Sequence, residues 1–446
     1  MRQLFLYNFM EQLQKGSKKL LNAWAFYDWA NSVYSLVIST AVFPIYYSSM
    51  ASSFSDVEGK INFLGTQWDP TALYDYTLAF SFLIVAIISP ILSAIADYTG
   101  NKLKFLKVFC LIGSLSVMSL FFFKGESTLW IAITFTITAS IGFWGSIVFY
   151  NAYLPEIAYP EQQDNVSAKG FIYGYTGSII LMIISLVLVQ TQVFGLYDEA
   201  IGSRITFVLV GLWWLGFAQI TYKRLPNNVY NRKPQKDYIW KGFKELKKVW
   251  MEVKQHRNLK LFLVAFFFFS VGVQTIVLMA GIFGSKELGL PTFNLILTIM
   301  LVQIVAILGA FLFSRLSNKY GNLFALKLTL IFWCVVCVIA FVLDKSLANI
   351  DLYFYVLGGV LGLVLGATQS LSRSTYSKLL PETEDHATFF SFYDVTEKIA
   401  IVLGMIVFGL LIAFTGSMQW SVMLLAVFFL IALIVLTRIK GSKYVK

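Results

Sequence analysis

Polar side chains that bind solutes or exchange protons stand inside otherwise apolar stretches of this sequence. The first group, Tyr27-Asp28-Trp29-Ala30-Asn31-Ser32, places a carboxylate and an amide three residues apart, on neighbouring faces of one helix turn. A carboxylate within a bilayer is costly unless it faces protein or water. We therefore predict that Asp28 binds a proton or a substrate amine and that Asn31 lines a cavity, with Tyr27 and the lone amide Asn151 as further candidates. The alternative is that Asp28 is solvated at a helix end.

The second group is Gln369-Ser-Leu-Ser-Arg373, whose amide and guanidinium are four residues apart and therefore share one helix face. An arginine facing lipid would be unfavourable, so Arg373 is expected to face the protein interior. There it can bind a substrate carboxylate with two hydrogen bonds, or pair with Glu382, Asp394 or Glu397 as a structural gate. The sequence is compatible with both roles of Arg373, substrate binding and a structural ion pair.

A tight turn is expected after the second apolar stretch, where Asp97-Tyr-Thr-Gly100 stands, and a similar turn ends at Gly321. Glycine permits the left-handed conformation, and the carboxylate of Asp97 can face a neighbouring helix N-terminus. This pattern favours a conformational latch. The alternative is a solvated turn whose lysines, Lys102 among them, only fix topology. Because Asn318 replaces the acid in the second copy, we expect the latch to be one-sided.

Four further acids are assigned to the predicted latch from their positions in the sequence. Glu156 and Glu382 end two matching segments, Tyr150-Asn-Ala-Tyr-Leu-Pro-Glu and Tyr376-Ser-Lys-Leu-Leu-Pro-Glu. Asp394 and Glu397 are expected to open the eleventh apolar span, where acids suit the positive end of the helix dipole. We interpret these two acids as helix caps.

The elements that position these residues are membrane spans. Of 446 residues, 58% are hydrophobic and 13% are charged, whereas soluble domains carry about 25% charged residues. Apolar runs long enough to cross a bilayer recur along the whole chain. We predict an all-α membrane protein with twelve spans, at 24–50, 73–96, 105–123, 129–152, 169–190, 204–222, 259–283, 293–313, 323–343, 352–376, 397–415 and 417–437.

The distribution of Lys and Arg predicts the orientation. If the N-terminus is cytoplasmic, only five of the 35 basic residues fall in outside loops: Lys60, Lys124, Arg204, Lys286 and Lys345. This predicts a multi-pass protein with both termini in the cytoplasm, in a bacterial inner membrane. The net charge of +11 is thereby explained by topology, and no nucleic-acid partner is expected.

The matching turns and Pro-Glu segments recur at nearly equal separations, which indicates two pseudo-symmetric six-helix halves around a central cavity. The expected organisation is a cytoplasmic lead, an N-terminal half, a basic linker, a C-terminal half and a cytoplasmic tail: 1–23, 24–222, 223–258, 259–437 and 438–446. Apolar residues repeat at helical spacing in the linker, which predicts an amphipathic helix on the inner leaflet. Its role as an anchor, or as a switch for anionic lipid or a partner, stays open.

Several chemistries find no support in the sequence. No Gly-rich phosphate loop with Lys-Ser/Thr occurs, so flux must depend on an ion gradient or on the gradient of the solute itself. A membrane transferase would need clustered catalytic groups, but His256 and His386 lie in separate loops. The three cysteines fall in apolar runs and are read as small hydrophobic residues. We expect no enzyme activity, no cofactor and no metal site.

Four segments resemble the autophagy-related vacuolar effluxer-like family of the major facilitator superfamily. They are Tyr27 to Ser32, Phe149-Tyr-Asn-Ala through Pro155-Glu156, Gly170 to Gly177, and Gln369-Ser-Leu-Ser-Arg373-Ser. The resemblance covers the chain from the first span to the eleventh. It implies the major facilitator fold and alternating access and, as in the fungal vacuolar members, export of amino acids.

The sequence therefore predicts a monomeric secondary transporter that moves a small solute through the bilayer, with H⁺ or Na⁺ as the coupling ion. The rival hypothesis is a transport-inactive receptor or scaffold that recruits a partner through the basic linker. Retention of polar residues in the spans argues against that rival.

Overall fold

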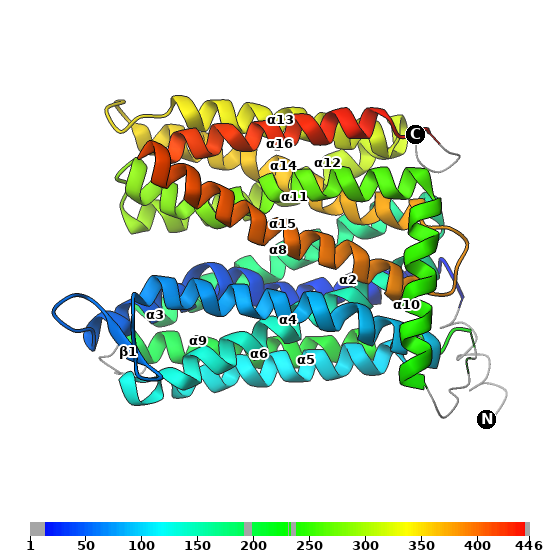
Figure 1. The fold of residues 1–446 in the computed structure, drawn as a ribbon, viewed down its shortest axis with the longest axis horizontal. Coiled ribbons are helices and arrows are strands. Elements are labelled where there is room, and N and C mark those ends of the chain that lie inside the picture. The colour runs from blue at the N-terminus through cyan, green and yellow to red at the C-terminus, as the bar shows by residue number, and fades with distance from the viewer. Residues whose placement is uncertain (1–13, 191–198, 231, 233–237, 442–446) are drawn as a thin grey trace.

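The computed structural model describes residues 14–190, 199–230, 232 and 238–441, and these residues are almost entirely helical (Figure 1). Within them, twelve helices are long and apolar enough to cross a membrane, as predicted. Large apolar side chains such as Leu83, Val427 and Leu430 remain about half exposed on the outside of the bundle. Such a surface suits lipid as the surrounding solvent. The predicted lead and tail lie partly outside the described residues.

Six spans form the N-terminal half. Their elements are α2 (Lys18–Val33), η1 (Tyr34–Val42) and α3 (Phe43–Ser53), which together make the first span, then β1 (Ile61–Phe63), β2 (Thr66–Trp68), α4 (Pro70–Thr99), α5 (Lys102–Ser119), η2 (Leu120–Phe122), η3 (Glu126–Thr128), α6 (Leu129–Ala152), α7 (Leu154–Ile157), α8 (Pro160–Gln190) and α9 (Glu199–Tyr222). The two short strands pair antiparallel, with Asn62 opposite Gln67.

Six further spans form the C-terminal half, after the linker helix α10 (Tyr238–Gln255). They are α11 (Arg257–Ile282) with η5 (Phe283–Glu287), α12 (Thr292–Tyr320), α13 (Asn322–Val342), α14 (Ile350–Leu379), α15 (His386–Thr415) and α16 (Met418–Thr437).

Local sequence explains where α4 begins and ends. Asp69 caps its N-terminus by accepting a hydrogen bond from the Ala72 backbone at 2.9 Å, and Pro70 occupies the first turn. Gly100 ends the helix with φ 71° and ψ 13°, the left-handed conformation that the sequence predicts there. The turn at Gly100 is short because α5 begins at Lys102.

The two halves lie side by side, and α10 runs across the ends of both (Figure 1). We call this end of the bundle the linker face. The halves meet where α8 packs against α12 and α14 and where α15 packs against α4 and α6. These six helices therefore position most of the side chains discussed below.

Several predicted span boundaries are wrong by six residues or more. The fifth span begins at Pro160 and not at residue 169, and the eleventh begins at His386 and not at residue 397. Polar residues precede both predicted starts, among them Asp164 and Asp394, and they lie inside the helices because protein covers them. The first span likewise begins at Lys18, before the predicted residue 24.

Candidate functional site

Asp28 and Arg373 form an ion pair between the two halves. Asp28 lies on α2, Arg373 lies on α14, and the Nη1 and Nη2 atoms of Arg373 are 3.1 and 3.2 Å from Oδ2 of Asp28. Both residues are buried. An unpaired charge at such a position would be costly, so each residue makes burial of the other tolerable. The predicted partners of Arg373, namely Glu382, Asp394 and Glu397, are wrong.

Further donors and acceptors complete this pair. Tyr150 donates a hydrogen bond to Oδ2 of Asp28 at 2.8 Å, and Asn151 accepts one from Nη1 of Arg373 at 3.4 Å. Ser167 accepts two bonds from Arg373, at 3.0 Å through its hydroxyl and at 2.8 Å through its backbone carbonyl. Asp28 is thus a buried residue of the interior, and the alternative of a solvated helix end is wrong.

Aromatic rings and a glycine surround the pair. The guanidinium of Arg373 lies 4.9 Å from the ring centroid of Trp24 and 4.2 Å from that of Phe171, which adds cation–π attraction. A Cβ atom on Gly170 would collide with Oδ2 of Asp28 and would lie 2.8 Å from Nη2 of Arg373. Only glycine fits there without displacing the pair.

The other predicted cavity residues, Gln369, Asn31 and Tyr27, lie in environments that differ from one another. Gln369 lies one helix turn from Arg373, and its Oε1 accepts a hydrogen bond from Tyr175 at 2.5 Å. Asn31 is buried, and its amide nitrogen makes no hydrogen bond within the described residues. Tyr27 packs on the rings of Tyr150 and Tyr222 inside the N-terminal half. Asp28, Asn151 and Arg373 are therefore brought together directly, and Tyr27 is not.

Sequence reasoning missed several residues of this cluster. Tyr150 stands next to the polar residue Asn151 in an apolar span, and this position could have identified it as a candidate. Ser167, Tyr175 and Trp24 carry no such signal, because serine and aromatic residues are common in spans and only the packing of α8 and α2 brings them to the pair.

Asp97 binds the N-terminus of α15 in the other half. Its two carboxylate oxygens accept hydrogen bonds from the backbone nitrogens of Ala387 at 3.2 Å and of Thr388 at 2.7 Å, and Thr388 adds its hydroxyl at 2.8 Å. Free N–H groups and the helix dipole both favour a carboxylate there. This is the geometry that the turn sequence predicts for Asp97.

Three further residues, Lys102, Glu156 and His386, extend this contact. Lys102 pairs with Glu156 and lies 3.5 Å from Asp97, and His386 Nδ1 lies 3.1 Å from the same oxygen of Glu156. Lys102 is 5% exposed, so the alternative of a solvated turn is wrong for this lysine. We call Asp97, Lys102, Glu156 and the first turn of α15 the first gate contact.

A second gate contact joins the halves at α8 and α12. Asp164 of α8 accepts hydrogen bonds from Ser317 at 2.8 Å and from Asn322 at 2.7 Å, and Lys378 lies 2.8 Å from it. Gly321, between α12 and α13, has φ 96°. The expectation of a one-sided latch is therefore wrong, since the acid missing at Asn318 is supplied by the partner helix.

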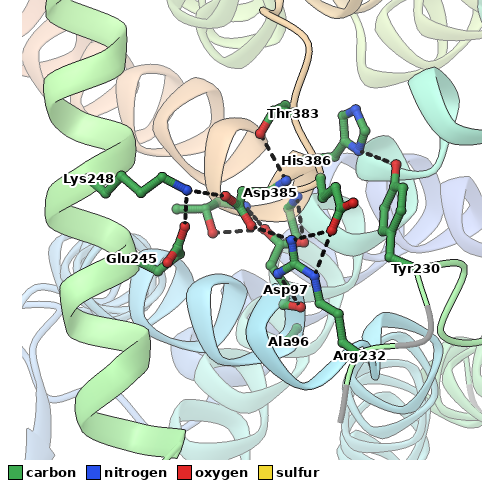
Figure 2. Close-up of polar contacts among 12 residues, drawn as sticks. Ala96, Asp97, Tyr230, Arg232, Glu245, Lys248, Thr383, Asp385 and His386 are labelled. Atoms are coloured by element: carbon green, nitrogen blue, oxygen red, sulfur yellow. Dashed lines mark hydrogen bonds and ion pairs between the residues drawn. The ribbon is translucent and has the colours of Figure 1, made fainter. Parts of the chain in front are cut away.

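The linker joins the first gate contact through Arg232. Figure 2 shows its guanidinium between Asp385, at 2.9 Å, and the backbone carbonyl of Asp97, at 2.7 Å. Lys248 of α10 lies 3.3 Å from Asp385, and Tyr230 lies 3.4 Å from His386. We call Arg232, Lys248 and Asp385 the linker clasp. Glu382, predicted to belong to the latch, is exposed on the same loop.

Charges in the clasp act on one another. Burial raises the pKa of Asp385, but the hydrogen bond with Glu245 and the charge of Arg232 outweigh burial and hold this pKa below its usual value. The hydrogen bond with Glu245 raises the pKa of Lys248 to about 12, with a further contribution from Asp385. Both groups are therefore charged over the physiological range.

Asp394 and Glu397 are not helix caps, because α15 begins at His386 and both lie well inside it. Lys398 pairs with Asp394 at 2.9 Å and with Glu397 at 3.4 Å, and Gln274 donates a hydrogen bond to Glu397 at 2.7 Å. The sequence reasoning did not single out Lys398. The sequence signal for this cluster was three charged residues within a stretch of five, inside an apolar span.

Comparison with known proteins places these features in a family. The family model described as "Vacuole effluxer Atg22 like" matches residues 16–445. An "Uncharacterized MFS-type transporter YxiO" of Bacillus subtilis (strain 168) is 33% identical over 428 residues, covering 95% of this chain and 95% of the relative. "Autophagy-related protein 22" of Coccidioides immitis (strain RS) is 25% identical, covering 90% of this chain and 83% of the relative.

Solved structures share the fold at low identity. The proton:xylose symporter XylE, a major facilitator superfamily protein, has a TM-score of 0.69 at 14% identity, with 96% of each chain covered. A bacterial homologue of the iron transporter ferroportin, in an outward-facing state, has a TM-score of 0.65 at 15% identity, covering 95% of this chain and 99% of that one. The predicted major facilitator fold is confirmed.

Proposed function

We propose that this chain, which belongs to the Atg22-like vacuole effluxer family, is a secondary transporter that moves a small solute across a membrane by alternating access. Amino acids are the first candidates for the solute, because the family resemblance implies them. The coupling ion that we propose is H⁺. The residues that we assign to the solute path are Asp28, Asn31, Asn151, Gln369 and Arg373.

The observation that carries this proposal is the Asp28–Arg373 pair. It is buried between the halves, and each half supplies one charge. Asp28 and Arg373 can release each other and bind a zwitterionic solute instead, Asp28 its ammonium and Arg373 its carboxylate. Charged residues within spans commonly mark substrate or ion pathways, since their cost must be offset by function.

The contacts between the halves support alternating access. Both gate contacts and the linker clasp lie at the linker face, and the Asp28–Arg373 pair lies deeper in the bundle. Opening the linker face requires that these hydrogen bonds break together. We assign the linker face to the cytoplasm because the basic residues gather on that side.

The receptor or scaffold alternative has less support. Arg232 and Lys248 of the linker already pair with Asp385 within the chain, so the charge of each is partly balanced internally in this conformation. No observation in the described residues favours a recruiting role over an internal one.

The test is reconstitution of the purified protein in liposomes, followed by a screen of radiolabelled amino acids with and without an inward proton gradient. We expect uptake of at least one amino acid above protein-free liposomes, and loss of that uptake in Asp28→Asn. A matched control is Asp344→Asn, which alters an exposed loop carboxylate outside the spans. If no amino acid moves in the wild-type protein, the proposed solute class is wrong.

A further inference from the structure

A cluster of three charged residues on α15 contains one negative charge more than it can balance. Asp394, Glu397 and Lys398 lie within five positions, well inside a 30-residue helix that spans the bundle. Two acids and one base leave an excess of one negative charge if all three are ionised. The Asp28–Arg373 pair, in contrast, is balanced. An excess charge inside a membrane protein requires a compensating cation.

One carboxylate oxygen of this cluster has no partner within the described residues. Lys398 Nζ lies 2.9 Å from Oδ1 of Asp394, and Gln274 supports Glu397 from α11. The other oxygen of Asp394, Oδ2, is buried and has no hydrogen-bond partner in the described part of the chain. Asp394 is 3% exposed and Lys398 is 1% exposed. A buried carboxylate oxygen without a donor is unfavourable unless it carries a proton.

From this cluster we propose that Asp394 binds the proton that drives transport. Lys398 responds to that proton and, through its contact with Trp144, changes the interface between the halves. The assignment rests on the proposed function for its meaning in transport, but the proton site stands on the geometry of α15. A hydronium ion of the aqueous phase supplies the proton: one of its O–H bonds breaks, water is left, and an O–H bond forms at Oδ2 of Asp394. On release the O–H bond at Oδ2 breaks and the proton returns to water as hydronium.

The surroundings of Asp394 favour a proton over a metal cation. Hard cations take several oxygen ligands, whereas the open position here offers the single oxygen Oδ2. The ammonium of Lys398 stands on the other oxygen of the same carboxylate and would repel a second cation. A proton needs one lone pair only.

The groups that face Asp394 come from several helices. Its own helix contributes Tyr393, Glu397 and Lys398, and α11 contributes Gln274 through Glu397. The ammonium of Lys398 lies over the ring of Trp144 in α6. The neighbouring α4 carries only Asp75 and Asp97 as charged residues, near its two ends, and α16 carries none.

Lys398 links the cluster to the other half of the molecule. Its ammonium lies 3.4 Å from the ring centroid of Trp144, which belongs to the N-terminal half. When Asp394 is protonated, its attraction for Lys398 weakens and Glu397 becomes the stronger partner. Because the position of Lys398 against Trp144 then depends on the proton, protonation can shift the balance between open and closed arrangements of the halves.

The direct test needs no substrate. Infrared difference spectra of the purified protein in liposomes are recorded between alkaline and acidic buffer, in choline chloride. We expect a carboxylic-acid C=O band from a buried carboxyl group in the wild-type protein, its loss in Asp394→Asn, and its retention in the exposed control Asp344→Asn. A band that persists in Asp394→Asn overturns the assignment, and so does a wild-type spectrum without the band.

A second variant, Glu397→Gln, tests the proposal even if Asp394→Asn does not fold. Glu397→Gln removes the excess negative charge but leaves Asp394 and Lys398 in place, so the band is expected to appear only at more acidic pH. An unchanged titration in Glu397→Gln contradicts the proposal. Repeating the series in NaCl separates the ions, because suppression of the band by Na⁺ but not by choline would identify a metal-cation site and overturn the proton site.

Transport measurements separate this inference from the proposed function. With the amino acid that gives the highest uptake, Asp394→Asn is expected to lose accumulation driven by the proton gradient and to retain exchange of labelled for unlabelled solute. Loss of both activities in a correctly folded variant would place Asp394 in solute binding and overturn the proposal. If the wild-type protein moves no amino acid, the proposed solute class fails while the infrared result still decides the proton site.

Discussion

The carboxylate of Asp28 and the guanidinium of Arg373 are separated by 345 residues in the sequence and by 3.1 Å in the structure. No local pattern joins them, and the fold alone makes them partners. Their burial makes each residue dependent on the other, because an unpaired charge in the interior is far more costly than the pair.

This dependence predicts a strong coupling between the two residues. Asp28→Asn and Arg373→Gln are each expected to lower the free energy of unfolding by about 3–5 kcal/mol, because each leaves one buried charge unpaired. The double variant is expected to be more stable than the sum of the two losses predicts. Thermal unfolding of the detergent-purified proteins measures this, and strictly additive losses would show that the pair is not coupled.

Gly170 is predicted to tolerate no side chain. Gly170→Ala places a Cβ atom against Asp28 and Arg373, so we expect a cost of about 1–3 kcal/mol from overpacking and loss of transport. The matched control is Gly216→Ala on α9, where a Cβ atom meets nothing within 4 Å. Equal effects of the two substitutions on thermal stability and uptake would refute the close approach at Gly170.

Fixing the second gate contact is predicted to stop transport. Asn165 and Asn318 are both exposed, belong to different halves and are joined by a hydrogen bond of 2.9 Å. In a background without Cys110, Cys334 and Cys337, Asn165→Cys with Asn318→Cys should be cross-linked by a short bifunctional thiol reagent. Uptake should then cease and return when a reducible cross-link is cleaved. Each single-cysteine variant serves as control, and full uptake by the cross-linked protein would contradict alternating access at this face.

The linker clasp predicts a pH dependence for docking of α10. The pKa of Asp385 is below its usual value, so its ion pairs stabilise docking fully above the ordinary range for aspartate, about pH 4, and the stabilisation is lost as pH falls through the lowered pKa. Hydrogen–deuterium exchange in α10, corrected for intrinsic rates, should show constant protection between neutral pH and about pH 4 and a loss below it.

A substitution tests the same contact at neutral pH. Asp385→Asn is expected to reduce protection of α10 at pH 7, because Arg232 and Lys248 lose their shared carboxylate. Glu382→Gln, on the same loop and exposed, is the matched control and should leave exchange unchanged. Identical exchange in both variants would mean that other contacts hold the linker.

The sequence allows prediction of the helices more readily than of their contacts. Hydropathy places all twelve spans, and the family resemblance identifies the fold. The starts of α8 and α15 were misplaced because hydropathy treats a charged residue as a span end, whereas Asp164 and Asp394 are covered by protein. The partner of Arg373 was sought among acids near it in sequence, but burial between halves joins residues distant along the chain.

The chemical roles in the two gate contacts are reversed between the halves. In the first, the turn between spans supplies the acid, Asp97, and the opposing helix supplies donors such as Thr388. In the second, the turn supplies donors such as Asn322, and the opposing helix supplies the acid, Asp164.

Two N-terminal halves placed together would therefore set Asp97 against Asp164, acid against acid, and two C-terminal halves would set donors against donors. Each half is complementary only to the other. Although the halves share one architecture, this asymmetry selects against self-association of identical halves as the chain assembles.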